Sequence, residues 1–433
     1  MKIAITTLGC KINQYDSAVI QSRLEEARHS FVPFEDKADF YIVNACTVTD
    51  RADWEARQLI RRAKRRSPAA RVLVTGCYAQ VKPQEVAEVP GVDFVVGLNR
   101  VQDLLRFVDQ TETPPDAERV AVGEVRKERG VSVLGARAFP GHTRAFLKIQ
   151  EGCNYSCTYC IIPTARGRSR SVPPEDIMRE IHALAERGFV EIVLTGIHLG
   201  GYGHDLDPKI DLTALLEVIL EKSPIRRLRL SSLDPREVSE RLLRLMPQSE
   251  RLCPHLHVCA QAGDDRILKQ MRRNYDAAYY RAIVTQAREL LPDAALGSDI
   301  IVGFPGESDE SFERQMEFFD SLPLTYFHVF PYSIRSTTVA ASLPDQVPNG
   351  VKKERAKKLR ELGARKKKEF YRRFLGRRVS VLVEGDSNVV GGLRGYSRNY
   401  LSVAVRGATH VNEEVEVAIE ALENGSLIGQ AIQ

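Results

Sequence analysis

The feature that most constrains the fold of this sequence is an alternation of apolar strand patterns and helix patterns in two separate series. The first series has four strand candidates: KIAITTLG (residues 2–9), FYIVNA (40–45), RVLVTG (71–76) and FVVG (94–97). Helix patterns separate them, one over about residues 14–28 and another that includes Ala56 and Ala63. Apolar strands joined by helical crossovers favour a parallel sheet covered on both faces. Residues 1–112 are therefore predicted to form an open α/β domain.

The second series predicts a larger domain over residues 139–370, after a polar linker at residues 113–138. Its six strand candidates are AFLKI (145–149), EIVLTG (191–196), RLRLSS (227–232), HLHV (255–258), LGSDIIVGF (296–304) and YFHVFPY (326–332). The helix pattern PPEDIMREIHALAERG between the first two opens with prolines and acids and closes at Gly188, as helix start and stop signals require. Six strand–helix units predict a partial (β/α)6 barrel related to the TIM architecture, with its active face at the loops after the strands.

The last part of the chain, residues 371–433, has a different pattern. RRVSVLVEG, GYSRNYLSVAVRG and EEVEVAIEALENGSLIGQ are short alternating strand patterns separated by glycine turns. Such a pattern predicts a small β-barrel. Barrels of this size often bind single-stranded nucleic acid.

Positive charge is concentrated in two segments. The 433 residues have a net charge of only +5, yet residues 351–378 contain 14 Lys or Arg and 3 Glu. RQLIRRAKRR (residues 57–66) adds six positive charges and no acid. A solvated helix face is one explanation, and a polyanionic partner, above all nucleic acid, is the other. There is no apolar run of about 20 residues and no signal-peptide pattern, so we expect a cytoplasmic protein without a membrane partner.

Eight cysteines occur in this long chain without an export signal, a setting in which cysteines more often bind metal or do chemistry than form disulfides. Six form two sets of three: Cys10, Cys46 and Cys77, and Cys153, Cys157 and Cys160. Each member of the first set follows a strand of the first domain, at the sheet edge where α/β proteins bind ligands. Convergence on one site is therefore expected. Cys253 and Cys259 are interpreted as small buried residues.

The second set follows the first strand of the predicted barrel in EGCNYSCTYC, with the spacing C-x3-C-x2-C and no fourth cysteine. Three thiolates that hold a four-iron cluster leave one iron free for an external ligand. A zinc ion completed by a distant histidine, or loose core cysteines, are the alternatives that spacing leaves open.

The neighbours of these cysteines carry a family resemblance. C-x3-C-x-aromatic-C, with Tyr159 as the aromatic residue, resembles the signature of radical S-adenosylmethionine enzymes. The resemblance implies that the open iron binds S-adenosylmethionine, which the reduced cluster cleaves to a hydrogen-abstracting radical. It also implies which residues line the cofactor pocket: Tyr159, Gly196, Ser231, Ile301 and Val302.

The resemblance extends over the whole chain and narrows the family. TLGCKINQYDS, VNACTVTDRAD, TGCYAQ, HLHVCAQAGDDRILKQMRR and SDIIVGFPGE are similar to motifs of the methylthiotransferases, and the C-terminal barrel is similar to a TRAM domain. This implies two [4Fe–4S] clusters: a radical cluster on the second cysteine set and an auxiliary, sulfur-carrying cluster on the first. S-adenosyl-L-methionine as cofactor and a reducing electron-donor protein as partner follow, and a monomer is expected.

The branch within the family is indicated by GCKINQYDS, CTVTDRAD and GYSRNYLSV, which resemble the MtaB-type enzymes. Those enzymes methylthiolate N6-threonylcarbamoyladenosine at tRNA position 37. Contacts with the tRNA anticodon stem-loop are expected from Arg372, Arg373, Arg377, Arg378, Tyr396, Asn399 and Tyr400. The alternatives are methylthiolation of isopentenyladenosine or of a ribosomal-protein side chain, or a non-catalytic iron–sulfur or zinc protein that binds RNA.

Overall fold

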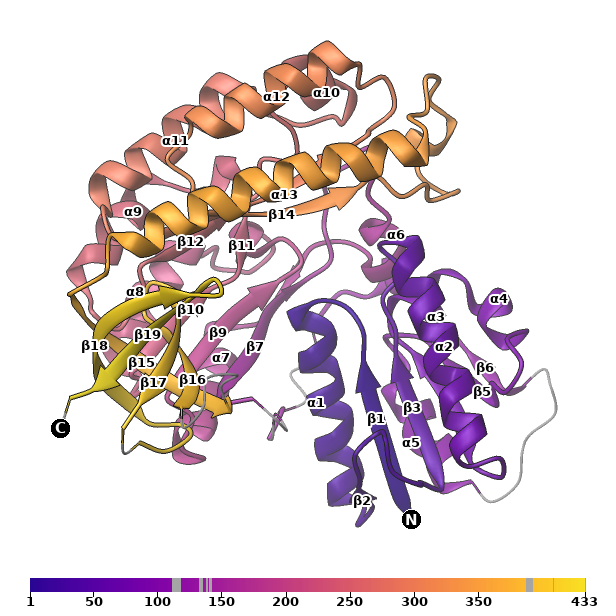
Figure 1. Ribbon diagram of the computed structural model, residues 1–433. Helices are drawn as coiled ribbons and strands as arrows, with labels where there is room; N and C mark the ends of the chain where they lie inside the picture. The colour runs from indigo at the N-terminus through magenta and orange to yellow at the C-terminus, as the bar shows by residue number, and fades with distance from the viewer. Residues whose placement is uncertain are drawn as a thin grey trace.

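The structure is a computed structural model that describes residues 1–110, 118–131, 135–137, 139, 142–386, 392–407 and 409–432. Parts of all four predicted segments lie outside the described residues: 111–112 of the N-terminal domain, 113–117, 132–134 and 138 of the linker, 140–141 of the central domain, and 387–391, 408 and 433 of the C-terminal barrel. Figure 1 shows an N-terminal sheet domain, a central domain of strands backed by helices, and a small C-terminal barrel. The predicted fold class is thereby confirmed.

The N-terminal domain is a six-stranded parallel sheet in the order β2-β1-β3-β4-β5-β6. Its strands are β1 (Lys2–Thr7), β2 (Ser30–Phe31), β3 (Phe40–Asn44), β4 (Arg71–Thr75), β5 (Phe94–Val96) and β6 (Val120–Ala121). Its helices are α1 (Lys11–Glu26), α2 (Asp50–Arg66), α3 (Cys77–Val81), α4 (Pro83–Ala87) and α5 (Val101–Asp109). The edge strand β6 falls within the segment predicted as a linker.

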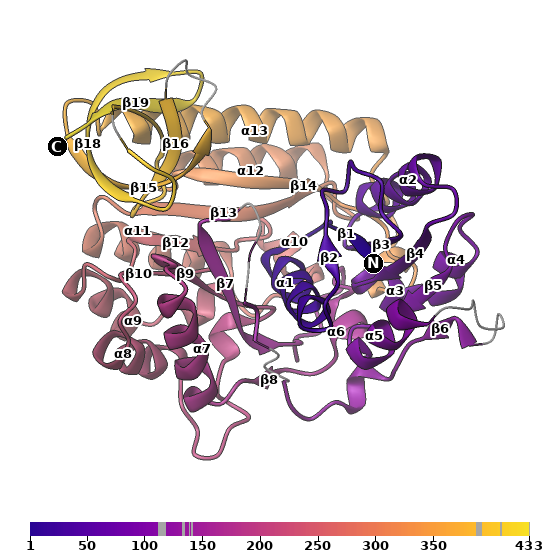
Figure 2. The ribbon, with the colours of Figure 1, turned by 90° about the horizontal axis from the view of Figure 1, so that it is seen from below.

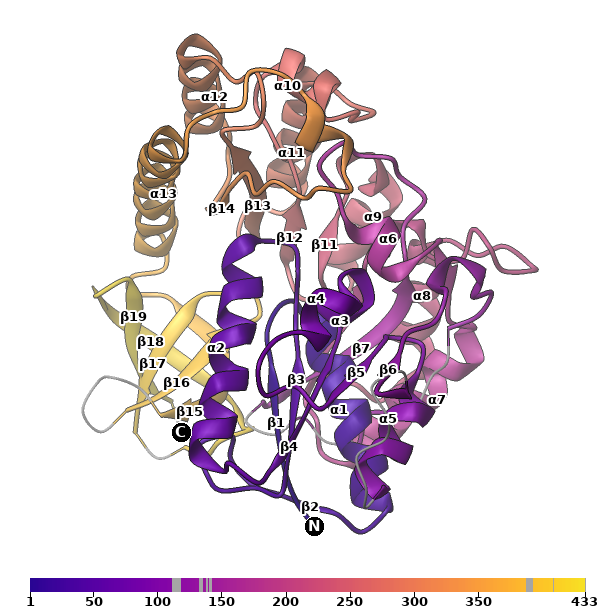
Figure 3. The ribbon, with the colours of Figure 1, turned by 90° about the vertical axis from the view of Figure 1, so that its right-hand side faces the viewer.

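Helices cover both faces of this sheet, as its apolar strands predict. On one face Ile20 of α1 and Phe107 of α5 pack against Phe40 and Phe94 of the strands. On the other face Ala56 and Ile60 of α2 belong to the second cluster of the domain. In Figure 3, α2 lies in front of the strands, toward the viewer. Its exposed side carries the basic run predicted from the sequence.

The central domain has two four-stranded sheets, β10-β9-β7-β8 and β11-β12-β13-β14, which together form the wall of a partial barrel. The strands are β7 (Arg144–Glu151), β8 (Arg170–Ser171), β9 (Glu191–Gly196), β10 (Arg227–Leu230), β11 (Ser232–Leu233), β12 (His255–Val258), β13 (Ala295–Val302) and β14 (Tyr326–Pro331). All six predicted strands are present and pair in parallel within each sheet. The short β8 adds an antiparallel strand to β7.

Helices cover the outer side of this wall and build the largest hydrophobic cluster of the protein. They are α7 (Pro174–Glu186), α8 (Leu212–Lys222), α9 (Glu240–Leu245), α10 (Asp265–Gln270), α11 (Ala277–Leu290), α12 (Asp309–Ser321) and α13 (Asn349–Arg372). The short α6 (Ile162–Arg166) lies instead against α3 of the N-terminal domain. In Figure 2, α1 of the N-terminal domain lies beside β7, at the side of the partial barrel that the outer helices leave open. A buried ion pair between Arg335 and Asp53, 2.8 Å long, also joins the two domains.

The C-terminal barrel is closed, with the order β15-β16-β17-β19-β18. Its strands are β15 (Arg378–Asp386), β16 (Gly392–Ser397), β17 (Ser402–Arg406), β18 (Glu414–Glu423) and β19 (Ser426–Ala431). The turn between β16 and β17 meets the N-terminal ends of the central strands. There Arg227 and Arg229 both donate to the buried Glu191, at 2.7 and 2.6 Å, and also donate to the backbone carbonyls of Tyr396 and Arg398. Glu191 thus holds the two arginines that bond to the C-terminal barrel, and Glu414 of the barrel also pairs with Arg227.

Candidate functional site: two three-cysteine sites

The first site is the loop between β7 and α6, which contains Cys153, Cys157 and Cys160. Gly152 begins the loop with φ +73°, and a side-chain Cβ there would lie 2.0 Å from the carbonyl oxygen of Arg168. Only glycine fits this approach. The tight turn directs the loop across the C-terminal end of the barrel, which is the end predicted to carry the active face.

A cavity of about 190 Å³ lies against the three cysteines. Tyr159, Ser232, Cys259 and Gln261 are among the residues that line it. Arg273 also lines it, donates through Nη1 to Cys157 Sγ at 3.1 Å, and pairs with Asp234. The cavity therefore combines three thiols with a cation and polar groups from several strand ends.

Of the five residues predicted to line the cofactor pocket, Tyr159 lines this cavity and the others lie next to it in sequence or farther away. Tyr159 lines it directly, and Gly196 immediately precedes its lining residues Ile197 and His198. The Ser231 hydroxyl is buried and has no hydrogen-bond partner within the described protein. Such an orphaned group is expected where a ligand supplies the missing partner.

Ile301 and Val302, at the end of β13, are not among the residues that line the cavity. The Ile301 amide donates to the carbonyl of Gln261, which itself lines the cavity. Contact of either residue with the cofactor stays a prediction.

The second site collects Cys10, Cys46 and Cys77 at the C-terminal edge of the N-terminal sheet, one after each of β1, β3 and β4. A Cβ added to Gly9 would lie 3.4 Å from Cys46 Sγ, so the loop that carries Cys10 passes directly over Cys46. Asn13 Oδ1 lies 3.7 Å from Cys10 Sγ. The predicted convergence of the three strand ends therefore brings these cysteines to one place.

Arg166 joins this second site to the central domain. Its Nε donates to Cys77 Sγ at 3.3 Å and its Nη2 donates to Asn13 Oδ1 at 2.7 Å. The guanidinium also pairs with Asp16 and Glu151, at 3.0 and 2.9 Å. The side chain is 1% exposed. A cation from the central domain thus lies beside the thiols of the N-terminal domain.

Burial raises the pKa of several thiols in the two sites above the ordinary value of a cysteine. Burial raises the pKa of Cys160 to about 12 and that of Cys153 to about 11. Burial, together with the neighbouring Cys77, raises the pKa of Cys46 to about 12. A bound metal cluster replaces these protons, because only thiolates act as ligands.

The spacing of the sulfur atoms distinguishes a cluster from zinc. A tetrahedral zinc site with bonds near 2.3 Å holds its sulfurs about 3.8 Å apart. Among the described residues, only a different group, one without cysteine, brings three ligand atoms within 4.8 Å of one another. Four-iron clusters hold their thiolates on separate irons and therefore farther apart. Among the described residues, neither cysteine set therefore forms a compact zinc site.

The residues predicted to bind RNA differ in their exposure and in their partners within the protein. Arg372 and Arg378 are exposed, whereas Arg373 and Arg377 pair with Asp293 at 3.1 and 2.6 Å. The aromatic rings of Tyr396 and Tyr400 stack on each other at 5.0 Å between centroids, and Tyr400 also lies against Arg229 and His255. Asn399 is buried and donates to the carbonyl of Asp293. Contact of these residues with RNA remains a prediction.

Two buried arginines at the cysteine sites, Arg166 and Arg273, were not predicted from the sequence. Arg166 stands six residues after Cys160, but it acts on Cys77 of the other domain, 89 residues away in sequence. Arg273 reaches Cys157 over 116 residues. No local pattern distinguishes these arginines from the many surface arginines of the chain, so only the fold identifies them.

Comparison with known families agrees with this geometry. Residues 147–319 match the Radical SAM superfamily, and residues 2–97 match a family described as "Uncharacterized protein family UPF0004". The structure of the radical S-adenosylmethionine methyltransferase TsrM from Kitasatospora setae, with cobalamin and a [4Fe–4S] cluster bound, has a similar fold. The TM-score is 0.56 at 17% identity, over 78% of this chain and 77% of that one. The class of protein is therefore a radical S-adenosylmethionine enzyme.

Relatives that match nearly the whole chain identify the family within this class of enzymes. A threonylcarbamoyladenosine tRNA methylthiotransferase MtaB from Aquifex aeolicus (strain VF5) is 40% identical, over 97% of this chain and 100% of the relative. The MtaB protein of Bacillus subtilis (strain 168) is 37% identical, over 98% and 94%. A tRNA-2-methylthio-N(6)-dimethylallyladenosine synthase from Clostridium novyi (strain NT) is 34% identical, over 99% and 96%. The chain belongs to the radical S-adenosylmethionine methylthiotransferase family.

Family membership implies S-adenosylmethionine and [4Fe–4S] clusters as cofactors. The residues present fit them, because each site offers three thiols and the cavity at Cys153, Cys157 and Cys160 also holds Arg273 and polar groups of Ser232 and Gln261. No helix in the described ranges has both the length and the apolar character that crossing a membrane requires.

Proposed function

We propose that this protein converts N6-threonylcarbamoyladenosine at position 37 of tRNA to its 2-methylthio derivative. The observation that carries the proposal is the presence of two separate three-thiol sites in one chain, of which one borders a cofactor cavity and the other is held to the same domain by Arg166. One site suffices for radical formation. A second site of the same kind is required where sulfur must also be delivered.

The two sites divide the chemistry between them. When bound, the clusters and S-adenosylmethionine supply the radical that removes the C2 hydrogen of the base and the methylated sulfur that replaces it. Cys153, Cys157 and Cys160 hold the first cluster, and Arg273 orients Cys157 and offsets thiolate charge. Cys10, Cys46 and Cys77 hold the second, with Arg166 in the same role at Cys77. The target base leaves its stack to reach an enclosed site, because an internal ring atom is otherwise inaccessible.

Exposed cations on two helices support binding of the anticodon stem-loop. On α13, Lys353, Lys368 and Arg372 are exposed and form no ion pair among the described residues. On α2, Arg61, Arg62 and Arg65 are likewise exposed. The only tryptophan, Trp54, is 59% exposed on the same helix and is available to stack on a nucleobase. Phosphate contacts of this kind make affinity strongly salt-dependent.

Dimethylallyladenosine is the second candidate substrate, because relatives named for it are also 34% identical over nearly the whole chain. The test uses reconstituted enzyme, reductant and S-adenosylmethionine with two stem-loops that differ only in the N6 substituent. Mass spectrometry of the nucleosides is expected to show the methylthio product from the threonylcarbamoyl stem-loop. Product from the dimethylallyl stem-loop alone would overturn the substrate assignment, and absence of cofactor cleavage would favour a non-catalytic RNA-binding protein.

The remaining partners follow from the reaction. Reduction of the first cluster requires an electron-donor protein, and the tRNA substrate places the enzyme in the cytoplasm. The two cysteine sites and the RNA-binding surfaces lie on one chain, so we propose that it acts as a monomer.

A further inference from the structure

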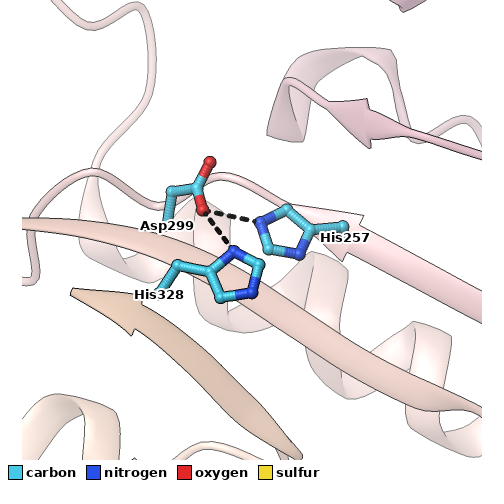
Figure 4. Close-up of side chains that lie close together, drawn as sticks. All are labelled: His257, Asp299 and His328. Carbon is cyan, nitrogen blue, oxygen red and sulfur yellow. Dashed lines mark hydrogen bonds and ion pairs between the residues drawn. The ribbon is translucent and has the colours of Figure 1, made fainter. Parts of the chain in front are cut away.

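A cluster of potential metal ligands lies apart from both cysteine sites, on three neighbouring strands of the central domain. His257 of β12, Asp299 of β13 and His328 of β14 bring their ligand atoms within 4.8 Å of one another (Figure 4). Asp299 Oδ1 lies 2.9 Å from His257 Nε2 and 3.1 Å from His328 Nδ1. Ligand atoms about 2.1 Å from one ion and at right angles to each other are about 3 Å apart. The observed separations match that geometry.

The position of the cluster follows from the alternation of side chains along the strands. Val258, Ile300 and Val329 point to the helix side of the wall and belong to the large hydrophobic cluster. The neighbouring His257, Asp299 and His328 therefore project to the opposite, concave side of the partial barrel. His328 is 57% exposed there, so the group is accessible to a ligand.

The negative charge of Asp299 lacks a lysine or arginine partner within the described ranges. The carboxylate side chain is 25% exposed, and within the described ranges no lysine or arginine pairs with it. In the part of the chain that the structure describes, its ion-pair partners are the imidazoles of His257 and His328. Placing a carboxylate out of water is costly without a compensating cation. A divalent ion held by both rings supplies that charge.

The side chains around the cluster form hydrogen bonds of the kind that orient metal ligands. The second ring nitrogen of His257, Nδ1, lies 3.2 Å from the Tyr326 hydroxyl, which in turn lies 2.7 Å from His255 Nε2. The other oxygen of Asp299 accepts from the Cys259 thiol at 3.3 Å. Metal-binding histidines and carboxylates characteristically have such partners, which fix the orientation of the ring and the carboxylate.

We propose that His257, Asp299 and His328 form a binding site for a divalent metal ion, with open coordination positions toward the concave side of the barrel. Two histidines and one carboxylate suit Mn²⁺, Fe²⁺ or Zn²⁺. The site is one contact away from the cofactor cavity, because Cys259 both lines that cavity and touches Asp299.

The ion also has a role in substrate recognition, and this second inference rests on the proposed function. The threonylcarbamoyl substituent carries carboxylate, hydroxyl and carbonyl oxygens, which are good ligands for a divalent ion. The dimethylallyl substituent has no oxygen. An ion at this site therefore favours binding of the threonylcarbamoyl substrate.

Manganese binding to the reconstituted holoenzyme tests the site itself. After chelator treatment, Mn²⁺ is titrated and the free ion is followed by its paramagnetic resonance signal, with cluster iron counted separately. One Mn²⁺ per chain is expected. His328→Ala, at an exposed position that leaves folding intact, is expected to weaken binding at least about 10-fold, as is Asp299→Asn. His182→Ala, on the exposed surface of α7, is the matched control and is expected to bind normally.

Absence of Mn²⁺ binding to the wild type, or equal binding by His328→Ala, would show a hydrogen-bonded cluster only and overturn the proposal. The recognition role is tested by the affinity of the two stem-loops with and without Mn²⁺. A preference for the threonylcarbamoyl stem-loop that does not change with Mn²⁺ overturns that role and leaves the site. Failure of the proposed function is distinguishable, because it appears as lack of methylthio product while Mn²⁺ still binds.

Discussion

Arg166 of the central domain donates a hydrogen bond to Cys77 of the N-terminal domain, with 3.3 Å between Nε and Sγ. The guanidinium is buried and also reaches Asn13, Asp16 and Glu151. Burial raises the pKa of Glu151, but the cations of Arg166 and Lys148 outweigh burial and lower that pKa to about 2. The charged network therefore persists at neutral pH and ties the auxiliary site to the radical domain.

Arg166→Gln is expected to disturb the auxiliary site selectively. Loss of the donor to Cys77 leaves more negative charge on that thiolate, so the reduction potential of the auxiliary cluster falls. The unpaired carboxylates left behind lower the free energy of unfolding by about 3 kcal/mol. Potentiometric titration followed by paramagnetic resonance measures the first effect. Arg168→Gln, two residues away and exposed, is the control, and an equal shift in both variants contradicts the assignment.

The two cysteine sets are expected to fail differently when each loses one ligand. Cys157→Ala removes a ligand at the cofactor cavity, so cleavage of S-adenosylmethionine is abolished. Cys46→Ala leaves that cavity intact, so some cleavage remains while the methylthio product is lost. Chromatography of 5′-deoxyadenosine and mass spectrometry of the stem-loop measure the two outcomes. Identical loss of cleavage in both variants would refute the division of labour.

Arg372 and Arg377 on the C-terminal side of α13 are expected to contribute unequally to RNA binding. Arg372 is exposed and forms no ion pair within the described ranges, so Arg372→Ala removes a free cation and lowers the salt dependence of tRNA affinity by roughly one unit of slope. Arg377 pairs with Asp293 at 2.6 Å, so Arg377→Ala changes the slope less. Binding of a stem-loop at several salt concentrations measures both slopes. Equal slopes would mean that Arg377 breaks its ion pair with Asp293 when RNA binds, and they would contradict the expected difference.

The sequence was sufficient to predict the elements of the fold that depend on local patterns of polar and apolar residues. The strand and helix patterns of both α/β domains recur in the structure, and the strand-end positions of Cys10, Cys46 and Cys77 predicted their shared site. Contacts that depend on the packing of one domain against another could not be predicted. Arg166 resembles any surface arginine until α6 packs against α3 of the N-terminal domain. His257 and His328 belong to strands 71 residues apart and become neighbours only because β13 lies between β12 and β14.

The residues of the C-terminal barrel that were predicted to contact RNA also show how far sequence patterns reach. Tyr400, predicted as an RNA contact, lies against Arg229 and His255 at the end of the central barrel. The sequence indicated a polar, aromatic turn typical of a binding surface. Its position beside the concave side of the barrel depends on how the turn from β16 to β17 docks on Arg227 and Arg229, which no local pattern encodes.

Glu191, which both of those arginines contact, is expected to make the docking of the two domains acid-sensitive. Burial alone would raise the pKa of Glu191, but Arg229 and Arg227 outweigh it and hold the pKa at about 2. An acid with a lowered pKa stabilises the fold above its ordinary value near 4.5, and that contribution is lost as the pH falls toward 2. The difference corresponds to about 3 kcal/mol of unfolding free energy.

Glu191→Gln is therefore expected to lower the free energy of unfolding by about 3 kcal/mol at pH 7, because two buried arginines lose their counter-charge. The deficit relative to the wild type narrows as the pH falls from about 4.5 toward 2, since the wild type then loses the same contribution. Denaturant unfolding followed by circular dichroism at stepped pH measures both trends. Glu420→Gln, exposed on β18, serves as the control and is expected to unfold like the wild type throughout. A deficit that stays constant down to pH 2 would show that Glu191 stabilises the contact through packing and not through its charge.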